Sequence, residues 1–94
     1  MEINKLFGKP KTYNIGGVEF TFKPLELENV DLLMDFEDKN KRGEVIKKLI
    51  IETFKKSYPE LQEEEIKKIS FKYFEDIMRA IFDVNGLEIP EDKK

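Results

Sequence analysis

The chain has 94 residues, with 17 Lys or Arg against 20 Asp or Glu, and it contains no Cys and no His. This length predicts one domain with a single core. The missing Cys excludes disulfides, thiolate nucleophiles and zinc–cysteine sites, and the missing His removes the usual general base near neutral pH. No segment approaches the roughly 18 consecutive apolar residues of a membrane span, and the start lacks the order of charges of a signal peptide. We therefore expect a cytoplasmic protein.

The first third of the chain predicts a flexible lead-in followed by a β-hairpin. Residues 1–11 show no apolar period. In residues 12–22 the Gly16-Gly17 pair separates two segments that alternate apolar and polar residues, which is typical of a two-residue hairpin turn. The turn opposes Ile15 to Val18, so that one face carries the side chains of Tyr13, Ile15, Val18, Phe20 and Phe22. Because a lone hairpin is marginal in water, we expect the segments downstream to cover this face.

Helical periodicity predicts four helices after the hairpin, at about residues 27–39, 44–57, 60–69 and 71–85. The inward stripe of the first is predicted to be Leu27, Val30, Leu33 and Met34. In the last, Ser70 is the expected N-cap and Gly86 the helix-ending residue. Its predicted inner face consists of Phe71, Phe74, Ile77, Met78, Ile81 and Phe82.

These elements define the fold class. We predict a mainly helical α+β domain over residues 12–87, in which the N-terminal hairpin packs on a bundle of about four helices. Residues 88–94 are expected to form a flexible tail.

Catalytic and metal-binding interpretations are weak. A carboxylate pair of the glycosidase type needs a deep cleft, which a chain of this length rarely builds. Asp31, Asp35 and Asp38 recur along the first predicted helix, but this spacing lacks the looped oxygen cage that calcium requires. We therefore predict a protein that is not an enzyme and that uses no catalytic residue, cofactor or metal.

A surplus of apolar residues remains after each element has received one inward stripe. It lies on the first two predicted helices and comprises Leu32, Phe36, Ile51, Phe54 and Tyr58. The apolar side chains of the second helix spread over roughly 240° of arc. Two interpretations are open: these residues belong to a core that surrounds the second helix, or they line an apolar groove that receives a partner's helix.

A small nucleic-acid-binding or regulatory module is the alternative function. It would use Lys39, Lys41 and Arg42 as phosphate contacts. The net charge of −3 opposes this function, because phosphate-binding surfaces normally need clustered and uncompensated basic residues.

The order of motifs resembles a known family. Residues 13–25, YNIGGVEFTFKPL, precede a helix with an acidic start, and residues 58–66 read YPELQEEEI. Over about residues 12–87 the chain resembles the tail assembly chaperones of long-tailed bacteriophages and related proviruses. The resemblance implies a non-enzymatic protein that binds the long, apolar, helical tape measure protein and keeps it soluble while tail tube subunits assemble around it.

The resemblance also implies partners and a gene arrangement. The expected partners are the tape measure protein and, secondarily, the tail tube protein, with self-association left open. Many members of the family exist as a short form and a frameshifted long form, and this chain would match the short one. The family dictates no particular binding residues.

Overall fold

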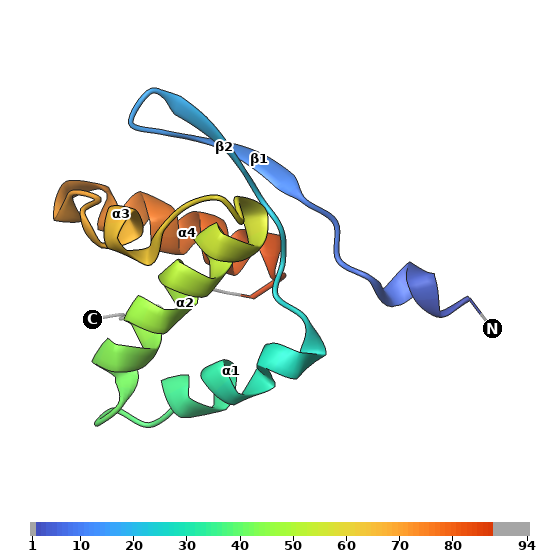
Figure 1. Cartoon of the computed structure of the whole chain (residues 1–94). Coiled ribbons are helices and arrows are strands. Elements are labelled where there is room, and N and C mark those ends of the chain that lie inside the picture. Colours follow the sequence, from blue (N-terminus) through green and yellow to red (C-terminus); the bar gives the residue numbers. More distant parts are fainter. Residues whose placement is uncertain (1, 88–94) are drawn as a thin grey trace, which may run out of the picture.

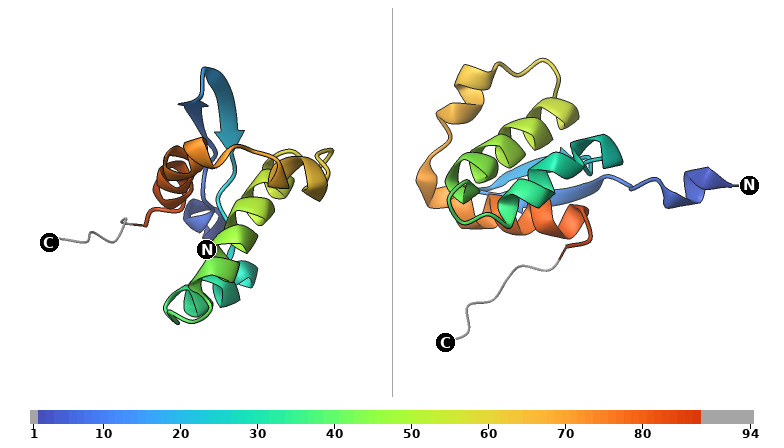
Figure 2. Two further views of the ribbon diagram at one scale, coloured as in Figure 1. Left: turned by 90° about the vertical axis from the view of Figure 1, so that its left-hand side faces the viewer. Right: turned by 90° about the horizontal axis from the view of Figure 1, so that it is seen from below.

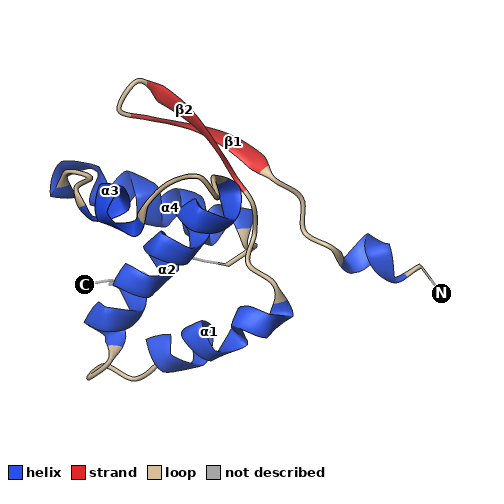
Figure 3. Cartoon of the chain, viewed as in Figure 1, coloured by secondary structure: helices blue, strands red, loops and turns tan. Residues whose placement is uncertain are grey.

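The computed structural model describes residues 2–87 and shows an antiparallel β-hairpin followed by four α-helices (Figures 1 and 3). The predicted α+β class, mainly helical, is confirmed. A short 3-10 turn, η1 (Ile3–Leu6), precedes the hairpin within the predicted lead-in. The predicted tail at 88–94 lies outside the described residues.

The hairpin has the predicted register. Strands β1 (Lys11–Ile15) and β2 (Val18–Phe22) pair with Ile15 opposite Val18, and β1 begins one residue earlier than predicted. Gly16 and Gly17 have φ angles of 61° and 82°, the two positive values that a tight two-residue turn requires.

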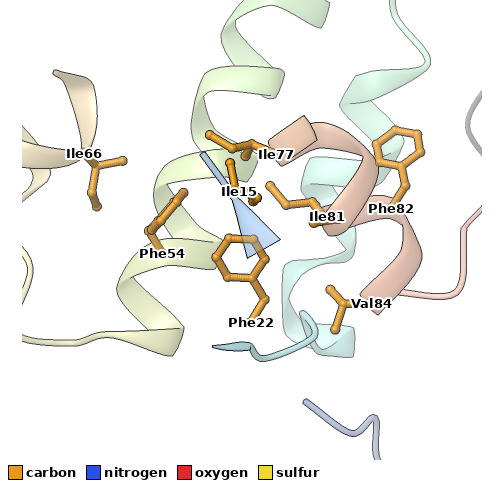
Figure 4. Packing of buried hydrophobic residues seen from close by; sticks show 9 residues of the cluster. Ile15, Phe22, Phe54, Ile66, Ile77, Ile81, Phe82 and Val84 are labelled. Atoms are coloured by element: carbon orange, nitrogen blue, oxygen red, sulfur yellow. The ribbon is translucent and has the colours of Figure 1, made fainter. Parts of the chain in front are cut away.

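Helices α2 (Arg42–Ser57) and α4 (Phe74–Val84) cover one face of the hairpin (Figures 1 and 2). Phe22 is fully buried, and its ring meets that of Phe54 from α2 edge to face at 5.0 Å between centroids. Ile77 and Ile81 from α4 join the same cluster, which Figure 4 shows at close range. The predicted cover is therefore confirmed, except at Val18, which lies beside the turn and remains half exposed.

The end of α2 also closes the outer edge of β2. The backbone N–H of Thr21 donates to the Tyr58 hydroxyl at 2.8 Å, and that of Lys23 donates to Ser57 Oγ at 2.9 Å. These groups would otherwise form an unpaired sheet edge. The helix thus holds the hairpin through backbone groups as well as through apolar contacts.

The second half of the chain follows the predicted capping. Ser70 Oγ accepts the backbone N–H of Lys72 at 3.2 Å, at the start of η3 (Phe71–Tyr73), which leads into α4. At the other end, the Leu87 N–H donates to the Phe82 carbonyl at 2.8 Å across Gly86, in the predicted helix-ending arrangement. Helix α3 (Glu63–Lys67) is shorter than predicted, because Gln62 and Glu65 form a capping box that begins the helix there.

Two predicted faces are wrong. The first helix consists of η2 (Leu27–Asn29) and α1 (Val30–Phe36), and three of its four predicted inward residues, Leu27, Val30 and Met34, are exposed. The helix instead turns its other face inward: the Phe36 ring packs on Phe82 at 5.8 Å between centroids. Phe71, predicted to face inward from the last helix, is also largely exposed and stacks on Phe74.

Candidate partner-binding surface

The five residues predicted to form a partner groove do not come together on one surface. Phe54 is only 1% exposed and belongs to the core, where it cannot contact a partner. Phe36, Ile51 and Tyr58 are half-buried and pack against that core, and Leu32 on α1 is half-buried as well. The core interpretation therefore describes these positions better than a shared groove.

Two small hollows reach residues of this predicted set. Ile51 lines one of about 140 Å³ between α2, α3 and the start of α4, next to Phe71. Phe54 lines another of about 310 Å³, between the hairpin turn and Tyr73. The first is smaller than the 300–1,000 Å³ of typical ligand pockets and the second lies at the lower limit of that range, and both are open to solvent.

A larger apolar surface lies on the exposed face of η2 and α1. Leu27, Val30 and Met34, here called the α1 stripe, are 86%, 40% and 66% exposed. Their i, i+3, i+7 spacing places them on one side of the helix. The sequence predicts that this stripe faces inward. Periodicity cannot tell the two cases apart, because an inward-facing stripe and an exposed stripe have the same helical period.

The N-terminal segment, residues 2–10, forms an arm that projects from the body beside β1 (Figures 1 and 2). Its apolar side chains are Ile3, Leu6 and Phe7, which are 57%, 83% and 64% exposed. Gly8 brings the arm close to the chain that leaves β2, since a Cβ at this position would lie 2.5 Å from Pro24 Cγ. The arm thus crosses Pro24 at a point where only glycine fits without a shift.

An open cleft of about 960 Å³ separates the arm from the segment that leads into α1. Its apolar lining comes from both sides, with Ile3, Leu6 and Phe7 on the arm and Pro24, Leu25 and Leu27 opposite. The cleft and the α1 stripe meet at Leu27. Together they form a continuous apolar surface that runs from the arm to α1.

This surface is strongly acidic along the helix. Residues 26–38 contain six carboxylates and no basic residue. Lys56 lies 3.4 Å from Glu26 at one end, and Lys41 lies 3.9 Å from Asp35 at the other. The middle of the segment retains its negative charge, which favours a partner with basic residues.

The basic residues of the alternative function are partly engaged by the fold. Arg42 Nε donates to the Phe36 carbonyl at 2.9 Å, and its guanidinium lies 5.0 Å from the centroid of the Phe36 ring. Lys41 is the cation that approaches Asp35. These contacts hold the end of α1 and leave a smaller basic surface for phosphate than the sequence alone indicates.

A cluster of three titratable side chains, Tyr13, Lys11 and Asp83, links the hairpin to α4. The Tyr13 hydroxyl donates to Asp83 Oδ2 at 2.6 Å, and Lys11 Nζ lies 3.4 Å from the same oxygen. The Tyr13 hydrogen bond, with help from Lys11, lowers the pKa of Asp83. Burial and the nearby carboxylate raise the pKa of Tyr13. Since the group lies on the surface and in none of the hollows described above, we assign it a structural role.

Among residues 2–87, no group of three or more acidic side chains is arranged to hold a metal ion. Within the same part of the chain, no helix is long and apolar enough to cross a membrane. Comparison with protein-family models, curated proteins and solved structures finds no match.

Proposed function

We propose that this chain is a non-enzymatic binding protein that holds an apolar helical segment of a partner during phage or provirus tail assembly. The observation that carries the proposal is the α1 stripe, an exposed apolar row on a helix whose opposite face is packed. Exposed apolar surface of this kind on a small chain is typical of a docking site. The absence of Cys and His is compatible with a protein that binds and does not catalyse.

The geometry of the stripe fits a helix as ligand. From Leu27 to Met34 the stripe runs about 10 Å along the axis, close to two helical turns. A partner helix with apolar residues at i, i+3 and i+7 could lie along it, and full burial of each apolar side chain would contribute about 1.5–3 kcal/mol. The neighbouring cleft would receive a further apolar side chain beside Leu27.

The resemblance to tail assembly chaperones supplies the identity of the proposed partner. On this proposal the partner is the tape measure protein, a long apolar helical chain that needs cover before the tail tube surrounds it. The tail tube protein is the second proposed partner, and the host cytoplasm is the proposed location.

Co-purification with the tape measure protein of the same genome tests the proposal. We expect the wild-type chain to form a complex and the double variant Leu27→Asp, Met34→Asp to lose it while the far-ultraviolet circular dichroism stays native. Phe71→Asp is the control, since it places one such charge on a comparably exposed apolar residue elsewhere, and the single variant Leu27→Asp matches it in charge.

Two results would contradict the proposal. One is the absence of any complex with the wild-type chain together with salt-sensitive binding to DNA, which would favour the nucleic-acid alternative. The other is an equal loss of binding in the Phe71→Asp control, which would show that the α1 stripe is not the docking surface.

A further inference from the structure

We infer that the N-terminal arm of one copy docks on the α1 stripe of a second copy, so that two chains exchange arms. The inference goes beyond the proposed function because the occupant is this chain itself: the arm of a second copy covers the α1 stripe in the free protein and must leave it when a partner helix binds there. It rests on an apolar arm, an apolar stripe and opposite charges on the two, all within one sequence.

The arm presents a compact apolar edge. Ile3 and Leu6 stand three residues apart in a 3-10 turn, where side chains at i and i+3 eclipse each other. Phe7 follows directly, and all three side chains are exposed. No residue of η1 is buried, so the chain's own body leaves this edge uncovered.

The α1 stripe has a matching length. Ile3 to Leu6 spans about 6 Å at the rise of a 3-10 helix, and Phe7 extends the row by one residue. The stripe runs about 10 Å from Leu27 to Met34. One arm is therefore long enough to cover most of one stripe.

Complementary charge favours the arm as the segment that binds the α1 stripe. The arm, residues 2–10, carries two lysines and one glutamate, and Lys9 is left over after Lys5 pairs with Glu2 at 3.0 Å. Residues 26–38 carry six carboxylates and no basic residue. Asp31 lies beside the stripe, because it follows Val30 in the helix and precedes Met34 by three residues. Within residues 2–87, neither Asp31 nor Lys9 has an ion-pair partner inside 4 Å, so both are available to a second chain.

The structure favours exchange between copies over closure within one chain. The arm continues directly into β1 at Lys11 and is seated against Pro24 at Gly8. The open cleft keeps its apolar edge apart from Leu25 and Leu27 of the same chain. Two copies related by a twofold axis would each supply one arm and one stripe, which gives a closed dimer with two equal contacts.

Disulfide trapping tests the contact directly, since the natural chain has no Cys. A Leu6→Cys chain is mixed with a Met34→Cys chain and oxidised, and a mixed dimer is expected in higher yield than with the control pair Leu6→Cys and Phe71→Cys. A chain that carries both Leu6→Cys and Met34→Cys should give a covalent dimer. If that chain instead yields a covalent monomer, the arm folds back on its own body and the inference is wrong.

Sedimentation equilibrium of the full chain supplies the second readout. We expect a dimer that weakens about tenfold or more on Leu6→Asp, a loss of at least 1.4 kcal/mol of association free energy. Lys9→Glu should also weaken it, and mixing the Lys9→Glu chain with an Asp31→Lys chain should restore association. A monomer at all concentrations, or a dimer insensitive to Leu6→Asp, would overturn the inference.

Different experimental results would refute the arm exchange and the proposed function. A monomeric chain that still captures the tape measure protein through the α1 stripe would refute arm exchange and leave the proposed function intact. A dimer with exchanged arms and no affinity for the tape measure protein would do the reverse.

Discussion

Two regions of the molecule differ sharply in how far their apolar side chains are buried. One consists of the hairpin, α2 and α4, and the other of the arm and α1. Five of the eleven residues of α4 are buried, whereas α1 buries none of its seven. The hairpin's inner face meets two helices and the β2 edge is closed by hydroxyl groups. Around the arm and α1, comparable apolar side chains remain exposed. The chain itself thus covers the apolar side chains of one region, while those of the other remain exposed.

Truncation of a large side chain should separate the two regions most clearly. Phe54→Ala removes a core ring and should cost about 3–5 kcal/mol of unfolding free energy. Met34→Ala removes a side chain of the α1 stripe and, at a concentration where the chain is monomeric, should change stability by no more than about 0.5 kcal/mol. Urea unfolding followed by circular dichroism measures both. Equal losses would show that the stripe is packed in solution and would remove the contrast between the regions.

A smaller effect is expected where the hairpin turn approaches α4. A Cβ at Gly16 would lie 2.8 Å from Cε1 of Tyr73, whereas one at Gly17 would meet nothing within 4 Å. Both positions have positive φ, so each alanine should cost about 1–2 kcal/mol from backbone strain alone. Gly16→Ala should cost at least about 1 kcal/mol more than Gly17→Ala in the same unfolding assay, because the Tyr73 ring must move. Equal costs would mean that the turn does not seat against the helix.

The smallest effect concerns the hydrogen bond between Tyr13 and Asp83. Tyr13→Phe should raise the pKa of the Asp83 carboxyl toward its usual value, measured by NMR titration of that carboxyl. A lowered folded-state pKa stabilises the fold above the ordinary pKa of Asp, and this contribution disappears as the pH falls through the folded value. The variant should therefore be less stable than wild type at pH 7 and differ less from it at pH 2. An unchanged pKa would show that Lys11 alone sets the titration.

Local features of the fold could be predicted from the sequence because they depend on neighbouring residues. The Gly16-Gly17 turn fixes the hairpin register through backbone angles alone, and Ser70 and Gly86 mark the ends of the last helical segment through local hydrogen bonds. The predicted helix at residues 60–69 is longer than α3, because the apolar period extends beyond both ends of α3. The capping box of Gln62 begins the helix only at Glu63.

The candidate site could be predicted only in part. An excess of apolar residues on the first two helices is compatible with a core or with a partner groove, and the positions concerned, Phe54 above all, lie in or against the core. That the chain is a binding protein stays a prediction. The exposed row Leu27, Val30 and Met34 was predicted to face inward. Residues 1–11 show no apolar period and predict only a flexible lead-in, whereas the structure shows Ile3, Leu6 and Phe7 exposed along the arm.

Composition and short-range geometry are enough to predict the class of the fold, the hairpin register and the absence of Cys and His chemistry. The tertiary structure alone decided which of two apolar faces of α1 turns inward. Both faces have the helical period, so sequence periodicity cannot choose between them. Phe36 packs on Phe82 of α4, a contact across 46 positions of the chain, and this orientation of α1 leaves Leu27, Val30 and Met34 exposed.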